Sequence, residues 1–224
     1  MFASLCLLLA AAFAALGVWQ IERRAWKLDL IAKVEARIHA PPRALPAAAE
    51  WRDDLAYTRV RVTGVFLHEA EALVQAVTDL GPGWWVETPL RTDKGVVLVN
   101  RGFVPSERKA PETRRAGMPL GPVGVTGLLR ASEPGGGFLR ANDPAADRWH
   151  SRDVAAIAQA RGLGPVAPFF IDADASANPG GYPVGGLTVV AFRNNHLVYA
   201  LTWFGLAALS LSGAALLLGT RGRR

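Results

Sequence analysis

The stretch FASLCLLLAAAFAALGVW, residues 2–19, contains no charged side chain, and a second such stretch runs from Leu197 to Gly219. A helix that crosses a membrane needs roughly 20 predominantly apolar residues. The first stretch is at the short limit of that requirement, whereas the second is long enough to cross with some tilt. A cleaved signal peptide is the alternative for the first stretch, but the basic segment expected before its apolar run is missing. We therefore predict transmembrane helices over residues 1–20 and 196–219.

Nearly all the charged residues lie between these two stretches. The chain has 25 Lys and Arg against 19 Asp and Glu, and its sequence contains no block of basic residues interleaved with aromatic ones. This balance argues against nucleic acid as a partner, and the positive charge is interpreted as attraction to membrane lipid or to an anionic ligand. The alternative is that the charged side chains are simply solvated. The short tail over residues 220–224 is basic, which predicts that both termini are cytoplasmic and that the intervening domain faces outward.

The single cysteine, Cys6, lies in the first apolar stretch. No disulfide can therefore form within one chain, although an outward-facing domain would lie in an oxidising compartment. With one cysteine and two methionines, the chain also lacks the set of soft ligands that holds copper. A role in copper delivery is disfavoured.

Residues 21–40 predict an amphipathic connecting helix that continues from the first membrane segment. Its apolar side chains recur every four residues: Trp26, Leu30, Val34 and Ile38. This stripe either packs on the domain or lies on the membrane surface. Pro41 and Pro42 are expected to end the helix, because the residue before a proline is disfavoured in helical geometry.

From Tyr57 the apolar pattern changes to a period of two, as in YTRVRVTGVF, which is typical of a half-buried strand. Further runs of this kind are EALVQAV, WWVETPLR, GVVLVNRGFVP, GVTGLLR and LTVVAFR. The turn sequence TDKG at residues 92–95 predicts a hairpin between two of them. One short helix is expected over residues 151–161, capped by Ser151 or Asp153.

These patterns predict the fold class and the domain organisation. The chain is expected to be a membrane protein in which two transmembrane helices flank one extracytoplasmic α+β domain, mostly antiparallel β, over residues 41–192. We find no internal repeat and no low-complexity tail.

The sequence carries no recognisable catalytic motif, so the chain is predicted not to be an enzyme. It has no G-x-S-x-G and no P-loop, and its four histidines form no zinc-binding pair. Asp172 and Asp174 are expected to be solvent-facing turn residues, because Asp favours turns. A membrane-anchored enzyme whose catalytic residues are dispersed along the sequence is the remaining alternative.

The junction FRNNHLVYALTWFG, residues 192–205, carries the candidate binding residues. His196 stands in the first turn of the second membrane helix, and Tyr199 and Trp203 share its face. A ring nitrogen of His196 could ligate a heme iron, since the helix dipole there favours the neutral imidazole that coordination requires. The same helix end, together with Arg193, would favour heme propionates. Alternatively, the aromatic residues mark a membrane interface and His196 bonds to headgroups or to loop backbone.

The chain resembles the Surfeit locus protein one family, the cytochrome c oxidase assembly factors. Four stretches carry the resemblance and span nearly the whole chain: LGVWQIERRAWKLDLI (16–31), VLVNRGFVP (97–105), PFFIDAD (168–174) and PVGGLTVVAFRNNHLVYALTWFGLA (183–207). The resemblance implies an assembly factor that transiently binds heme A and assists its insertion into oxidase subunit I. It also implies that the iron ligand is the histidine of NNHLVYA, which is His196 here.

The expected partners are oxidase subunit I, the heme A synthesis enzyme and membrane lipid. The expected heme contacts besides His196 are Trp203, Tyr199 and Arg193. The expected location is the bacterial inner membrane, with the domain in the periplasm, because no Arg- and Ser-rich leader precedes the first span. The alternative function is a membrane-anchored scaffold that stabilises an oxidase assembly intermediate without binding heme.

The segment from Asn100 to Pro105 belongs to the family pattern without an assigned chemical role. Asn-Arg-Gly after a strand is interpreted as a turn in which Gly102 takes a positive φ. The alternative is that Arg101 contacts a partner or a heme propionate.

Overall fold

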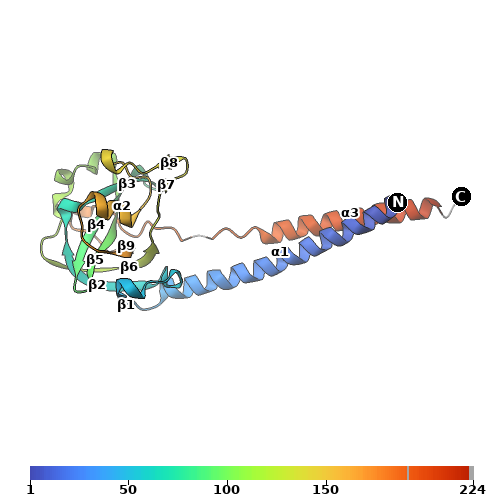
Figure 1. Cartoon of the computed structure of the whole chain (residues 1–224), viewed down its shortest axis with the longest axis horizontal. Coiled ribbons are helices and arrows are strands. Elements are labelled where there is room, and N and C mark those ends of the chain that lie inside the picture. The colour runs from blue at the N-terminus through green and yellow to red at the C-terminus, as the bar shows by residue number, and fades with distance from the viewer. Residues whose placement is uncertain (191, 222–224) are drawn as a thin grey trace. The chain divides into compact units, whose positions relative to one another are not determined.

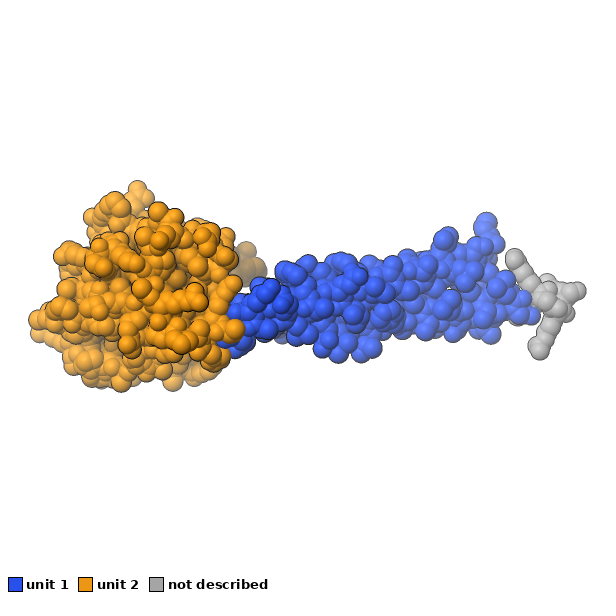
Figure 2. Space-filling view, turned by 90° about the horizontal axis from the view of Figure 1, so that it is seen from below, with its two compact units in different colours: residues 1–35, 190–224 blue, residues 36–189 orange. Residues whose placement is uncertain are grey.

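The computed structural model describes residues 1–190 and 192–221, and the chain divides into two compact units. The helical unit contains Met1–Glu35 and the chain from Val190 onward, and the barrel domain contains Ala36–Val189 (Figure 2). Residues 222–224 of the predicted basic tail lie outside the described part of the chain.

The helical unit contains helix α1 (Phe2–His39) as far as Glu35 and helix α3 (His196–Arg221) (Figure 1). Both are long and apolar enough to cross a membrane. Helix α1 runs without interruption through the predicted membrane segment and the predicted connecting segment, and it ends before Pro41. The two apolar helices lie at the two ends of the chain and flank a domain built mostly of sheet, as the sequence predicts.

Small side chains separated by seven residues line the buried faces of both helices. They are Ala3, Ala10 and Gly17 on α1, and Ala200, Ala207 and Ala214 on α3. Seven residues are close to two helical turns, so each set forms one stripe that allows close approach of the backbones. A Cβ atom added at Gly17 would lie 2.5 Å from the ring of Phe204, so this position requires glycine unless the ring moves.

The barrel domain is built on a seven-stranded sheet in the order β1-β2-β6-β9-β5-β4-β3. Only the β1–β2 and β5–β9 pairs are parallel, so the sheet is mostly antiparallel, as predicted. An additional pairing of β2 with β4 closes strands β2, β6, β9, β5 and β4 into a ring. The strands are β1 (Arg43–Ala44), β2 (Arg59–Phe66), β3 (Ala72–Thr78), β4 (Gly81–Thr92), β5 (Gly95–Pro105), β6 (Pro122–Ala131) and β9 (Val166–Ala173).

The ring has an apolar interior and a second apolar cluster on its outer face. Alternate residues of each strand point inward, and the interior core includes Val60, Val99, Val125, Phe169 and Ile171. On the outside, helix α2 (Val154–Ala160) packs over Leu98, Trp149 and Phe170. A small hairpin, β7 (Gly136–Gly137) with β8 (Arg140–Ala141), completes the domain.

Several local predictions are confirmed. Thr92, the last residue of β4, pairs with Gly95, the first residue of β5, so the TDKG segment is a hairpin turn. Helix α2 is shorter than the predicted 151–161, and Asp153 rather than Ser151 caps it, since its carboxylate accepts a hydrogen bond from the backbone N–H of Ala156 at 3.1 Å.

The predicted strand LTVVAFR does not form in its described residues, 187–190, 192 and 193. The run crosses the boundary between the two units, which falls between Val189 and Val190, and no strand of the sheet pairs with its described residues. The chain instead touches the sheet through an isolated bridge between Val184 and Phe103. Strand β9, in contrast, is not among the predicted strands, because consecutive residues of its run PFFIDA are buried on both faces and the run shows no apolar–polar alternation.

Gly102 has a φ of +127°, which confirms the predicted positive φ, but it lies within β5 and not in a turn. The reason is a close approach of two backbones. A Cβ atom added at Gly102 would lie 2.2 Å from the carbonyl oxygen of Val184. Only glycine satisfies both the dihedral angle and the contact.

We expect Gly102→Ala to lower the free energy of unfolding by about 1–3 kcal/mol or more, because it adds strain at positive φ and a clash with Val184. Gly124→Ala is the matched control, since Gly124 lies in β6 and an added Cβ atom there meets no atom within 4 Å. Thermal unfolding of the detergent-purified proteins measures both. Equal stability of the two variants would contradict this account of Gly102.

Candidate functional site

His196 opens helix α3 and is held by a residue of α1. Its Nδ1 atom lies 2.7 Å from Oε1 of Gln20, whose side chain is buried between the helices. An amide oxygen only accepts hydrogen bonds, so Nδ1 carries the proton and donates it. In the neutral ring Nε2 is then the unprotonated nitrogen. No hydrogen bond to Nε2 is found within residues 1–190 and 192–221.

The other three predicted binding residues differ in their surroundings. Trp203 lies two turns along α3 from His196, and its ring stacks on Phe13 of α1 with 5.7 Å between centroids and 25° between planes. Tyr199 is 55% exposed, and Arg193 is exposed in the segment before the helix. The structure thus places His196 and Trp203 against α1, whereas Tyr199 and Arg193 remain open to a ligand or to lipid.

Within the part of the chain that the structure describes, His, Cys, Asp and Glu side chains form no group of three that could hold a metal ion. His196 is the histidine of this junction that could ligate an iron. A single neutral imidazole is a common axial ligand of heme, and it does not hold a free metal ion tightly by itself.

Arg101 occupies the mouth of the barrel. It follows Val97 and Val99 on the inner face of β5, is almost completely buried, and lies with its guanidinium carbon 4.6 Å from the centroid of the Phe66 ring. Its NH2 group donates hydrogen bonds to the carbonyl oxygen of Gly117 and, at 3.4 Å, to Oδ1 of Asn178. Burial lowers the pKa of Arg101 to about 10, although the charge of Glu71 opposes that shift.

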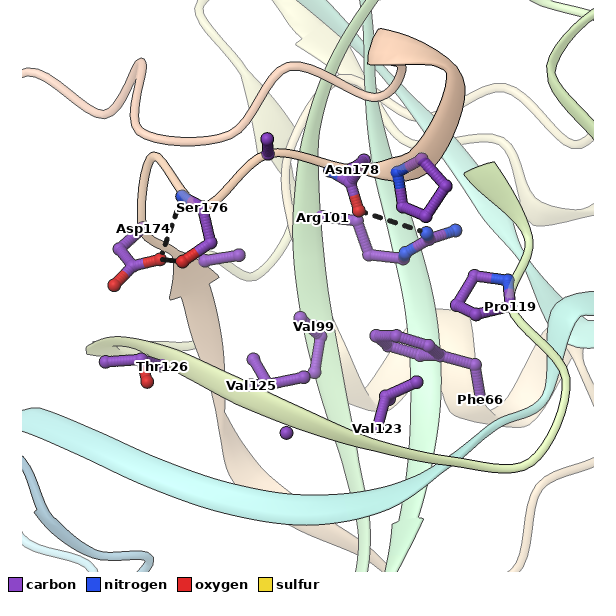
Figure 3. A pocket seen from close by; sticks show the side chains of 14 residues that line it. Phe66, Val99, Arg101, Pro119, Val123, Val125, Thr126, Asp174, Ser176 and Asn178 are labelled. Atoms are coloured by element: carbon purple, nitrogen blue, oxygen red, sulfur yellow. Dashed lines mark hydrogen bonds between the residues drawn. The ribbon is translucent and has the colours of Figure 1, made fainter. Parts of the chain in front are cut away.

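A cavity of about 220 Å³ lies beside Arg101 (Figure 3). Its walls are the inward side chains at the ends of the ring strands and two loop residues that follow β9: Phe66, Val99, Val123, Val125, Ser176 and Asn178. The mouth of a small barrel is a common place for a ligand site.

Asp172 lies on the outer face of the ring and is buried, so the prediction that it is a solvent-facing turn residue is wrong. β9 continues to Ala173, which keeps Asp172 in the sheet. Its carboxylate accepts hydrogen bonds from Asn100 at 2.8 Å, Arg130 at 2.7 Å and Arg152 at 3.0 Å.

Asp174 follows β9, where its carboxylate accepts a hydrogen bond from the backbone N–H of Ser176 at 3.1 Å. This geometry is an Asx turn, so the turn prediction is confirmed for Asp174.

Arg152 joins this outer cluster to Glu133. Its Nε donates to one carboxylate oxygen of Glu133 at 3.0 Å and its NH2 donates to the other at 2.5 Å. Burial alone would raise the pKa of Glu133, but the hydrogen bonds and charge of Arg152 outweigh it and lower the pKa. Asp172 and Glu133 are therefore each paired with arginine, which is typical of structural ion pairs.

Glu87 is fully buried on the same outer face, beside the ion pairs. Neither of its carboxylate oxygens has a hydrogen-bond partner among the described residues. Burial raises its pKa to about 8, although the charge of Arg152 opposes the shift. Glu87 is therefore a neutral acid at pH 7.

Comparison with known proteins matches residues 7–208 to the model of the SURF1 family. The chain belongs to the SURF1 family. Surfeit locus protein 1 of Mus musculus is 41% identical over 219 residues, which cover 90% of this chain and 71% of the mouse protein. Surfeit locus protein 1 of Takifugu rubripes is 36% identical over 220 residues, covering 90% of each. The SURF1-like protein of Monosiga brevicollis is 40% identical over 211 residues, covering 88% of this chain and 80% of that relative.

Two polar residues of this SURF1-family chain were missed by the sequence analysis. The sequence marks Gln20 only weakly as a candidate functional residue, as the first polar side chain after the apolar stretch. The sequence marks Glu87 more strongly, because it is a charged residue within the predicted strand WWVETPLR, and the structure buries it in β4. Gln20 bonds to His196, and Glu87 lies near the charge of Arg152. Both neighbours come from distant parts of the chain, so local sequence could not show which polar groups meet.

We expect the free energy of unfolding of the wild type to fall as the pH rises, and we expect Glu87→Gln to abolish this dependence. The folded protein keeps the Glu87 proton up to a pH of about 8, whereas the unfolded chain releases it near 4.5. The folded state binds more protons between those values, so raising the pH lowers the free energy of unfolding by about 1.4 kcal/mol for each pH unit. Gln is neutral throughout and removes this loss.

Denaturant unfolding of both proteins at pH 5.5 and pH 8 measures the effect. Glu69→Gln, at an exposed position, is the control and should follow the wild type. If Glu87→Gln also follows the wild type across this range, Glu87 is ionised in the fold and the assignment is wrong.

Proposed function

We propose that this SURF1-family chain is a membrane-anchored assembly factor for heme-copper cytochrome c oxidase. It binds heme A transiently through His196 and assists the insertion of heme into subunit I. One observation carries this proposal: the hydrogen bond from Nδ1 of His196 to Gln20 leaves Nε2 as a free acceptor. Family membership supports the connection to oxidase assembly.

The two apolar helices support membrane anchoring, since each is long enough to span a bilayer. The basic tail supports cytoplasmic termini, and two spans then leave the barrel domain in the periplasm of a bacterial inner membrane. At the outer interface of that membrane, His196 would stand where heme can be received from the heme A synthesis enzyme and given to subunit I.

Heme supplies an iron that takes a nitrogen lone pair and two propionates that attract cations. This chain supplies the neutral nitrogen. Gln20 fixes the tautomer and the plane of the His196 ring, as partners of metal-bound histidines commonly do. Because Gln20 lies on α1 and His196 on α3, the ligand is oriented only when the two helices pack together.

The remaining candidate residues fit supporting roles. Trp203 presents an aromatic ring that can pack on a macrocycle, and Phe13 holds that ring from the opposite helix. The exposed guanidinium of Arg193 can pair with a propionate. Tyr199 is exposed and can lie along the edge of the ligand or in the headgroup layer. None of these roles requires bond making by the protein.

A scaffold that stabilises an assembly intermediate is the second candidate, and one observation favours it. Phe138 and Leu139, at the tip of the β7–β8 hairpin, are 92% and 88% exposed. Adjacent exposed apolar side chains of this kind are typical of a surface that contacts another protein.

We expect the detergent-purified wild type, co-produced with heme A synthesis enzymes, to show a Soret band that His196→Ala lacks. The reason is that alanine removes the iron ligand while α3 still forms. Circular dichroism controls for folding. A band of equal height in both proteins would exclude His196 as the ligand, and no band in either folded protein would favour the scaffold.

Gln20→Leu should weaken heme binding by about 10- to 100-fold although His196 is present, because the ring loses its orienting partner. Heme titration followed by absorbance measures this affinity. Thr202→Val is the control, since Thr202 is exposed on α3 and its hydroxyl donates a hydrogen bond to the carbonyl oxygen of Val198, one turn back on the same helix. Wild-type affinity in Gln20→Leu would show that Gln20 does not prepare the ligand.

A further inference from the structure

The cavity at the mouth of the barrel combines apolar walls with one buried cation. Phe66 from β2, Val99 from β5, and Val123 and Val125 from β6 form the walls, and Arg101 lies among them (Figure 3). These side chains come from three strands of the closed ring, so the cavity is preformed by the fold. A mostly apolar recess with a few placed polar or charged groups is the usual construction of a small-molecule site.

The charge of Arg101 is incompletely satisfied. Its NH1 group is buried and has no hydrogen-bond partner among the described residues. A buried donor without a partner costs roughly 1–3 kcal/mol, and more when it is charged. The structure keeps this cation in place by stacking it on Phe66 and by hydrogen bonds from its NH2 group.

The neighbouring carboxylates are bonded to groups other than Arg101. Glu71 is engaged by Arg114, which donates to both of its carboxylate oxygens. Asp174, which also lines the cavity, accepts hydrogen bonds from Ser176 and lies 3.5 Å from Arg59. No salt bridge to Arg101 is found in the described ranges 1–190 and 192–221. The missing acceptor must come from outside the chain if the cation is to be paired.

We propose that this cavity binds a carboxylate attached to a small apolar body. The carboxylate pairs with Arg101 and supplies the acceptor that NH1 lacks, and the apolar body lies between Phe66 and the three valines. Because NH1 itself is buried, the proposal requires a side chain of the wall to move and admit one carboxylate oxygen. Charge-assisted bonds of arginine to carboxylate are among the strongest hydrogen bonds in proteins.

The volume restricts the ligand. A cavity of about 220 Å³ is smaller than the 300–1,000 Å³ typical of sites for drug-sized ligands, so a heme macrocycle does not fit. The body is the size of one apolar side chain. Two sources share this chemistry: a free short-chain branched carboxylic acid, and the C-terminal residue of a polypeptide that ends in an apolar amino acid.

Calorimetric titration of the full-length chain in detergent tests the proposal. The probes are 4-methylpentanoate, its neutral amide 4-methylpentanamide, and acetate, which has the charge without the apolar body. We expect 4-methylpentanoate to bind at least about tenfold more tightly than either of the others, because only it satisfies both Arg101 and the walls. Equal affinity for the acid and its amide, or no binding of the acid, overturns the proposal.

Two peptides separate the sources. An acetylated peptide ending in leucine with a free carboxylate is compared with the same peptide as its C-terminal amide. Tighter binding of the free-carboxylate peptide than of 4-methylpentanoate assigns the site to a polypeptide C-terminus. Binding of 4-methylpentanoate alone assigns it to a free acid.

Variants locate the binding in the cavity. Arg101→Met should abolish discrimination between acid and amide. Because that change touches a buried residue, Ala177→Leu is the second variant: Ala177 is an exposed loop residue that lines the cavity, and leucine there should block it. Ala175→Leu, in the same loop outside the lining, is the control. Wild-type binding of 4-methylpentanoate in folded Ala177→Leu or Arg101→Met overturns the assignment.

This inference is independent of heme binding. His196 belongs to the helical unit and Arg101 to the barrel domain, so His196→Ala should leave the calorimetric result unchanged. Failure of one proposal is therefore distinguishable from failure of the other.

Discussion

The pairing of β2 with β4 closes the sheet, and both faces of the barrel domain depend on it. The two strands meet where Val65 faces Arg91 and Phe66 faces Leu90. Gly64 permits the approach, because a Cβ atom there would lie 2.4 Å from the carbonyl oxygen of Arg91. Closure removes two sheet edges and separates an apolar interior from an outer face that carries the arginine and carboxylate cluster.

A different constraint governs the helical unit. Stripes of small side chains let α1 and α3 approach closely, and a polar pair, Gln20 with His196, lies at the end of that contact. In an apolar environment a polar side chain strongly favours a partner. The same packing that satisfies Gln20 therefore orients the imidazole, so helix association and ligand presentation are one event.

The parts of the fold that depend on local pattern could be predicted from the sequence. The two apolar helices, the hairpin at residues 92–95 and the positive φ of Gly102 each follow from a few adjacent residues. Ring closure could not be predicted, because it depends on a contact between Phe66 and Leu90 that no local pattern encodes. Strand β9 was missed because it is buried on both faces and so lacks alternation.

In the candidate site, too, features set by local sequence could be predicted and features set by distant contacts could not. His196 is recognisable from its place at a helix start and from the family resemblance, whereas its partner Gln20 lies 176 positions away in sequence. Asp172 was misassigned because Asp usually marks turns, and only the pairing of β9 with β5 and β6 reveals that it is buried. The sequence suggests a turn at Arg101. Its inward direction, and therefore its place in the wall of the cavity, becomes visible only in the closed ring.

The central claim is that Gln20 prepares the His196 ring for ligation at Nε2. Nitrogen NMR of the heme-free protein at pH 8, labelled with ¹⁵N-histidine and assigned by comparison with His196→Ala, tests it most directly. The account predicts that the neutral His196 ring carries its proton on Nδ1 and that Nε2 is unprotonated. A ring protonated on Nε2, with Nδ1 free, would contradict it.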